Sequence, residues 1–301
     1  MQRQRVELAG RPIGRLRASW LLFTETFRFF RADPELFWVP VLAAIVNLLV
    51  LGVILVVLIS GVLVSGVDPE AGDTTRYFEY AFVIIAYIVG AYILALAEAA
   101  IARVVSTRAR GGDATFGDGL AAAFAHARAL FIWALITSTV GLVLRFISER
   151  SQLLGRLVAS LLGVAWAVLT YFVVPSIVLE GSSATDAIRR SGAVFRGTWG
   201  ELVVANFGVG LIFVLGHVLL LVAGVGLMLG AAASGSGALA LVILVLYLVL
   251  AVVLVVLQQC FAGILKTLLF IYAVDAVPPA NFNPELLEKM LARKQEDPQS
   301  S

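Results

Sequence analysis

The longest uncharged stretch of this chain lies between Glu201 and Lys266, where 64 consecutive residues carry no Asp, Glu, Lys or Arg. As a single helix this stretch would be about 96 Å long, roughly three times the thickness of a bilayer core. It must therefore fold back on itself, and the flexible sequence Ala233-Ser234-Gly235-Ser236-Gly237 is the adequate turn. This predicts two membrane-spanning helices, over about residues 202–230 and 238–265.

Four more windows are apolar enough to cross a bilayer, which requires about 20 helical residues. They cover about residues 36–67, 80–103, 129–147 and 157–179. The third is short, so its charged end at Arg145 is expected to extend to the headgroups. Composition agrees, because 60% of the 301 residues are hydrophobic and only 14% are charged, against about 25% in soluble domains. The sequence predicts an all-α integral membrane fold with six transmembrane helices in three hairpins.

The placement of Lys and Arg predicts the orientation. With both termini in the cytoplasm, 18 of the 22 basic residues lie inside and only Arg76, Arg145, Arg150 and Arg156 lie outside. A re-entrant third segment would reduce this split to 14 against 8. We therefore expect a cell-membrane protein with a basic cytoplasmic leader (1–34), a six-helix domain (35–273) and a cytoplasmic tail (274–301).

Two cytoplasmic segments resemble each other. Residues 115–128 read TFGDGLAAAFAHAR and residues 183–196 read SATDAIRRSGAVFR, so each has a hydroxyl residue, an Asp three positions later and an Arg ten positions after the Asp. The hydroxyl and the Asp form a capping-box-like start. Each segment predicts a short amphipathic helix in the headgroup plane before a hairpin. The leader from Arg15 to Arg31 is a third copy without the box; its aromatic residues are Trp20, Phe23, Phe27 and Phe30.

The C-terminal tail contains a predicted amphipathic helix. Asn283-Pro284-Glu285 combines a cap, a proline suited to the first turn and an acid at the positive end of the dipole. The apolar residues that follow are Leu286, Leu287, Met290 and Leu291. This helix is expected to dock under the bundle or on a partner protein.

Several functional classes are excluded or disfavoured by composition. A net charge of +2 provides no strongly basic face for nucleic acid. Cys260 has no second cysteine to bond, and His126 and His217 have no metal-ligand spacing. The sequence contains no recognisable pair of a nucleophile and a base, so we do not expect an enzyme. A lipid-modifying activity is the remaining exception. We expect no cofactor. Membrane lipids are the expected partners, and a homo-oligomer is compatible with the sequence.

Ionisable residues inside the spans define the candidate polar site. Glu98 lies in the inner part of span two. It could act as a proton or cation carrier, as a headgroup contact, or as the structural partner of Lys266, and we favour the structural pair. Arg145 and Glu149 are an i,i+4 pair at the outer end of span three. The pair could form an anion site or anchor the end of the hairpin in the headgroups. The candidate contacts for anionic headgroups are Arg128, Arg189, Arg190 and Arg196.

A family resemblance covers most of the chain and is densest over about residues 137–206. It is carried by Val140-Gly141-Leu142, Leu144-Arg145, Glu149-Arg150, Gly155-Arg156, Trp166, Val174-Pro175, Glu180-Gly181, Ala187-Ile188-Arg189-Arg190-Ser191, Phe195-Arg196, Thr198-Trp199-Gly200 and Asn206. These residues resemble an uncharacterised prokaryotic family of multi-pass membrane proteins. More distantly, the chain is similar to the membrane domains of some glycerophosphodiester phosphodiesterases, whose catalytic domain has no counterpart in this sequence. The resemblance implies the architecture and no catalytic residues.

Two functions remain. The first is a non-enzymatic membrane protein that organises lipids or partner proteins through its cytoplasmic helices. The second is a small transporter or channel for a proton, cation or lipid that uses Glu98 and nearby polar groups. Inverted repeats and helices broken at mid-depth are typical of transporters. This repeat keeps one orientation and no window contains an evident Gly or Pro break at mid-depth, which favours the first function.

Overall fold

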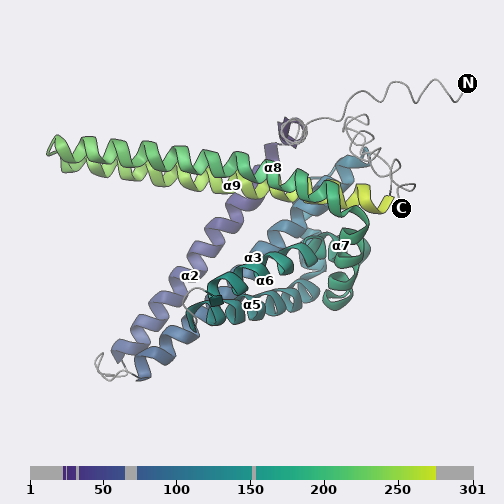
Figure 1. The fold of residues 1–301 in the computed structure, drawn as a ribbon, viewed down its shortest axis with the longest axis horizontal. Coiled ribbons are helices and arrows are strands. Elements are labelled where there is room, and N and C mark those ends of the chain that lie inside the picture. The colour runs from purple at the N-terminus through teal and green to yellow at the C-terminus, as the bar shows by residue number, and fades with distance from the viewer. Residues whose placement is uncertain (1–22, 25, 32–33, 65–72, 151–153, 276–301) are drawn as a thin grey trace, which may run out of the picture. The chain divides into compact units, whose positions relative to one another are not determined.

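The structure is a computed structural model that describes residues 23–24, 26–31, 34–64, 73–150 and 154–275 (Figure 1). Every element in these residues is helical. Residues 23–24 and 26–31 form what we call the leader helix. The other elements are η1 (Pro34–Phe37), α2 (Trp38–Val64), α3 (Asp73–Ala109), α4 (Phe116–Ala125), α5 (Ala127–Arg150), α6 (Leu154–Leu169), α7 (Val173–Glu180), α8 (Ala184–Ala233) and α9 (Gly237–Asp275). The helix predicted in the C-terminal tail lies outside the described residues.

Six stretches are long and apolar enough to cross a membrane, which confirms the predicted number. They are Glu35–Val57, Tyr80–Ala109, Ala127–Glu149, Gly155–Glu180, Gly210–Ala233 and Gly237–Asp275. The third is longer than the predicted range of about residues 129–147. Its 23 residues extend about 34 Å, which exceeds a bilayer core of about 30 Å. The sixth continues past the predicted end at residue 265, since the residues after Lys266 remain apolar up to Asp275.

The helices group into two compact units, which we describe separately. Unit 1 comprises Met1–Phe37, Ala109–Gly111 and Thr198–Ser301. Unit 2 comprises Trp38–Arg108 and Gly112–Gly197. Unit 1 thus contains the leader helix, most of α8 and all of α9, whereas unit 2 contains α2, nearly all of α3, α4 to α7 and the first part of α8.

Aromatic stacking and interhelical hydrogen bonds hold the centre of unit 2 together. The rings of Trp133 in α5 and Trp166 in α6 stack with centroids 6.0 Å apart. The indole N–H of Trp166 donates to the Oγ1 of Thr137 at 3.4 Å, and the hydroxyl of Ser138 donates to the carbonyl of Tyr87 in α3 at 3.1 Å. Such small polar side chains commonly join helices in lipid.

The first repeat segment forms the predicted capping box. Thr115 is the N-cap of α4, and its Oγ1 accepts the backbone N–H of Asp118 at 3.2 Å. In return, the Asp118 carboxylate accepts the backbone N–H of Thr115 at 2.8 Å. Two backbone donors that the helix cannot satisfy internally are thus satisfied reciprocally.

The second repeat segment begins as predicted and ends differently. The Oγ of Ser183 accepts the backbone N–H of Asp186 at 3.2 Å, so the capped start is confirmed. The expectation of a separate short helix is wrong, because α8 continues through to Ala233. No proline interrupts the sequence between Arg196 and the fifth span, and glycine alone weakens a helix without ending it.

Both repeat helices bury small residues at matching positions. Gly119 and Ala123 of α4 are buried, as are Ala187 and Ser191 at the aligned positions of α8. A Cβ on Gly119 would lie 2.8 Å from the carbonyl oxygen of Ala100 in α3, so α4 approaches α3 closely enough to require glycine. The repeat therefore encodes a docking face as well as a cap.

Span four is broken, contrary to the expectation of unbroken spans. Helix α6 ends at Leu169 and α7 begins at Val173, two residues before Pro175. Proline cannot donate a backbone hydrogen bond to the residue four positions earlier, and its ring disfavours helix before it. The sequence Val174-Pro175 was therefore the signal for the break.

In unit 1 the aromatic face of the leader helix packs against the spans. The rings of Phe23, Phe27 and Phe30 lie 5.3, 6.3 and 5.6 Å from the ring of Phe261 in α9. Phe213 of α8 completes the cluster at 5.5 Å from Phe261. The predicted aromatic stripe is thus present in the described part of the leader, where its rings contact Phe261 of α9.

Candidate functional site

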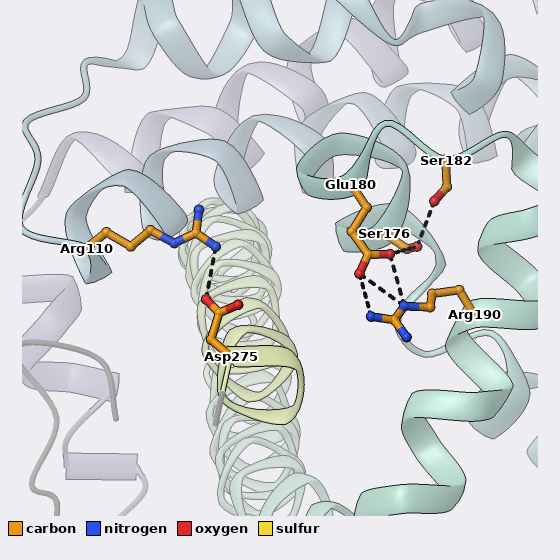
Figure 2. A network of polar contacts seen from close by, with 6 residues as sticks. All are labelled: Arg110, Ser176, Glu180, Ser182, Arg190 and Asp275. Carbon is orange, nitrogen blue, oxygen red and sulfur yellow. Dashed lines mark hydrogen bonds and ion pairs between the residues drawn. The ribbon is translucent and has the colours of Figure 1, made fainter. Parts of the chain in front are cut away.

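A polar cluster lies where α7 ends and α8 begins, within unit 2. The guanidinium of Arg190 donates to both carboxylate oxygens of Glu180, with its Nη2 at 2.8 Å from Oε1 and its Nε at 3.2 Å from Oε2 (Figure 2). The hydroxyl of Ser176 donates to Oε2 of Glu180 at 2.9 Å and lies 3.3 Å from the hydroxyl of Ser182. We call these four residues the α7–α8 clamp.

The sequence explains why this clamp forms. Glu180 is the last residue of α7, where the negative end of the helix dipole disfavours a carboxylate. Gly181 ends the helix with φ of +68°, a left-handed conformation that glycine adopts without strain. Arg190 on α8 neutralises the carboxylate, and this hydrogen bond raises the pKa of Arg190 above its usual range.

The same chemistry recurs in unit 1. Asp275 is the last residue of α9, and the Nη2 of Arg110 lies 3.1 Å from its carboxylate (Figure 2). Both side chains are more than one third exposed, so this pair contributes little stability. It nevertheless offsets a carboxylate at a helix C-terminus, as Arg190 does for Glu180.

A side chain from α8 satisfies the backbone at the break in span four. The N–H of Phe172 donates to the Oγ of Ser191 at 2.9 Å, and both residues are buried. On the other side, the hydroxyl of Thr170 donates to the carbonyl of Trp166 at 2.7 Å. In lipid an unsatisfied backbone group is costly, so Ser191 makes the broken span tolerable.

Glu98 lies near this break. Its carboxylate interacts electrostatically with the phenol of Tyr171, which is one of the residues between α6 and α7. The ring of Tyr171 packs edge-on against Phe172 with centroids 4.9 Å apart. Sequence reasoning identified Glu98 and missed Tyr171, although Pro175 lies four residues after Tyr171 and indicates where the span breaks.

The proposed pair of Glu98 and Lys266 stays a prediction. Both side chains are half-buried, but Glu98 belongs to unit 2 and Lys266 to unit 1. The other predicted pair is present, since the Nε of Arg145 lies 2.8 Å from a carboxylate oxygen of Glu149. Both partners are largely exposed, with 47% and 61% of their side-chain surface accessible, which fits a pair at the end of a span.

The four predicted headgroup contacts divide into two kinds. All four side chains are exposed, and Arg189 forms only a loose pair with Asp186, at 3.7 Å. Arg190 instead holds Glu180 in the clamp. Three of these arginines are therefore available to a surface ligand, whereas Arg190 has a structural role.

Groups suited to metal binding are not brought together in the described residues, where no cluster of three His, Cys, Asp or Glu side chains exists. The Nδ1 atoms of His126 and His217 each lie near the carbonyl four residues earlier, at 2.9 and 2.8 Å. Cys260 is buried, and its thiol lies 3.6 Å from the carbonyl oxygen of Leu36.

Comparison with known proteins places the chain in a family. A search of curated proteins finds no match. The model of a family of unknown function, DUF6159, matches residues 77–279, which include five of the six spans from the second onward, both repeat segments and the α7–α8 clamp. The chain therefore belongs to this family of unknown function, DUF6159.

Proposed function

We propose that this protein is a non-enzymatic multi-pass protein of the cell membrane that organises lipids or partner proteins at the cytoplasmic face, with both termini in the cytoplasm. The exposed arginines of the two repeat segments, residues 115–128 and 183–196, support this most directly. Arg128 and Arg196 occupy the same position of the two segments, ten residues after Asp118 and Asp186, and both are exposed. Membrane-surface arginines each attract anionic lipid by about 1 kcal/mol.

The experiment reverses the charge of two exposed arginines of the second repeat segment, Arg189 and Arg196, and leaves Arg190 in the clamp. The double variant Arg189→Glu, Arg196→Glu should lose the enrichment of anionic phospholipid that the purified wild type carries from mixed liposomes, and the loss should diminish as salt rises. Arg156→Glu is the control, because Arg156 is an exposed arginine at the predicted outer end of span four. Unchanged enrichment in the double variant would contradict a role in lipid organisation.

We also propose that the chain is distantly similar to the membrane domains of some glycerophosphodiester phosphodiesterases, a likeness that would agree with a lipid-facing role. We also propose that the repeat segments lie in the headgroup plane as amphipathic helices. For the second repeat copy, the first part of α8, up to Gly197, takes the place of a separate helix.

A transporter or channel is the second candidate, and the break in span four favours it. Transporters commonly use discontinuous helices beside an ionisable residue, and here Tyr171 in the break interacts with Glu98. Transport predicts that Glu98→Gln abolishes a pH-dependent flux in liposomes and leaves melting almost unchanged. A structural pair with Lys266 predicts instead that Glu98→Gln lowers the melting temperature and that adding Lys266→Met restores much of it.

A further inference from the structure

Arg128 has a position that favours a bound anion. It is the second residue of α5, where the positive end of the helix dipole disfavours a cation. Its side chain is exposed, and no carboxylate of the described residues forms an ion pair with it. An anion on its guanidinium would remove this unfavourable interaction.

Exposed apolar side chains lie three and four positions from Arg128 along the chain. Phe131 and Ile132, three and four residues later, share its face of α5 and are 44% and 39% exposed. Phe124, four residues earlier at the end of α4, is 58% exposed. The ring of Tyr92 packs edge-on against Phe131 at 5.4 Å and holds one side of this surface in place.

We propose that Arg128 binds the phosphate of one anionic phospholipid while Phe124, Phe131 and Ile132 contact its acyl chains. The inference rests on the proposed function and adds a defined site to it. A phosphate group and an apolar chain in the same molecule match a guanidinium beside exposed apolar side chains. Inorganic phosphate could use only the guanidinium.

Arg189 is the matched control, because it is an exposed arginine of the same unit with different surroundings. It is 84% exposed and lies 3.7 Å from Asp186. Its exposed neighbours one turn away are Thr185, Asp186 and Ala193, which provide no large apolar surface. A general attraction of anionic lipid to basic groups would treat Arg189 and Arg128 alike.

The test measures how many phosphatidylglycerol molecules the purified full-length chain retains, by native mass spectrometry against phosphatidylcholine. Arg128→Gln should weaken phosphatidylglycerol retention about fivefold, the change that corresponds to about 1 kcal/mol per arginine. Phe124→Ser should weaken it as well, although it changes no charge. Arg189→Gln, which loses only the general attraction of one arginine, should weaken retention less than Arg128→Gln does, and excess inorganic phosphate should not compete. Circular dichroism melting of each variant shows that its fold is intact.

The outcomes separate the site from the general function. Equal losses in Arg128→Gln and Arg189→Gln would overturn the site and leave the proposed attraction of anionic lipid standing. Displacement by inorganic phosphate with no effect of Phe124→Ser would also overturn it, since the ligand would then be a free anion. Retention unchanged in Arg128→Gln would overturn the site, whereas no selective retention by the wild type would overturn both proposals.

Discussion

The buried backbone N–H of Phe172 is satisfied by the side chain of Ser191, nineteen residues later on another helix, at 2.9 Å. This bond connects the break in span four to the repeat helix at the start of α8. The clamp between Glu180 and Arg190 adds a second connection at the other end of α7. Helix α7 is thus held to α8 at both ends.

We expect Ser191→Ala to destabilise the protein by about 1–3 kcal/mol, because it leaves a buried backbone donor unsatisfied. Ser160→Ala is the control, since Ser160 is an exposed serine on α6, and its effect should stay within about 0.5 kcal/mol. Thermal or denaturant unfolding in detergent measures both. Equal stability of the two variants would contradict the role of Ser191.

A double-mutant cycle on Glu180 and Arg190 should give a coupling energy of about 0.5–1 kcal/mol. The estimate is modest because 43% of the Arg190 side chain and 25% of the Glu180 side chain are exposed and solvent screens the pair. The folded-state pKa of Arg190 is raised, so its contribution is complete below the unfolded arginine value and is lost only above about pH 12. The coupling should therefore be constant between neutral and mildly alkaline pH.

Asp118 should make the first turn of α4 sensitive to acid. The backbone N–H of Thr115 is the main cause that lowers the pKa of Asp118, followed by the Thr115 hydroxyl. A lowered folded-state pKa means that stabilisation is complete above about pH 4, the unfolded value, and is lost as the pH falls through the folded value. Hydrogen exchange at the first-turn amides should be faster in Asp118→Ala than in wild type at neutral pH, and the difference should vanish in acid.

Two glycines of α4 should respond in opposite directions to substitution by alanine. Gly119→Ala should cost about 1–3 kcal/mol, because the new methyl group would meet the backbone of Ala100 at 2.8 Å. Gly117 has only the Thr115 hydroxyl nearby, at 3.6 Å, so Gly117→Ala should stabilise the helix by about 0.5–1 kcal/mol. Unfolding measurements on the two variants compare the same substitution at positions only two residues apart, which point to different sides of α4. A neutral Gly119→Ala would show that α4 does not dock closely on α3.

The orientation of the spans can be tested by labelling. In a Cys260→Ala background, single cysteines replace Arg189, predicted inside, and Ser234, predicted outside. A membrane-impermeant maleimide applied to intact cells should label position 234 and not position 189. The reverse pattern would invert the predicted topology.

The sequence by itself determined the six spans and the capped helix starts. Span length follows from runs of apolar residues and the thickness of a bilayer, and a cap such as Thr115 with Asp118 involves residues three positions apart. Both kinds of information are local. The pair Arg145 and Glu149 was predictable for the same reason, since it lies on one helix face.

The tertiary structure decided which side chains meet across helices. Arg190 looks like its neighbour Arg189 in sequence, yet the fold gives it Glu180 and leaves Arg189 exposed. Ser191 reads as one more small polar residue until the break in span four is placed beside it. These partnerships depend on how α7 packs against α8. Glu180 and Arg190 are ten residues apart, and Phe172 and Ser191 are nineteen. Neither spacing places two residues side by side on one helix, so the sequence pattern alone does not predict these contacts.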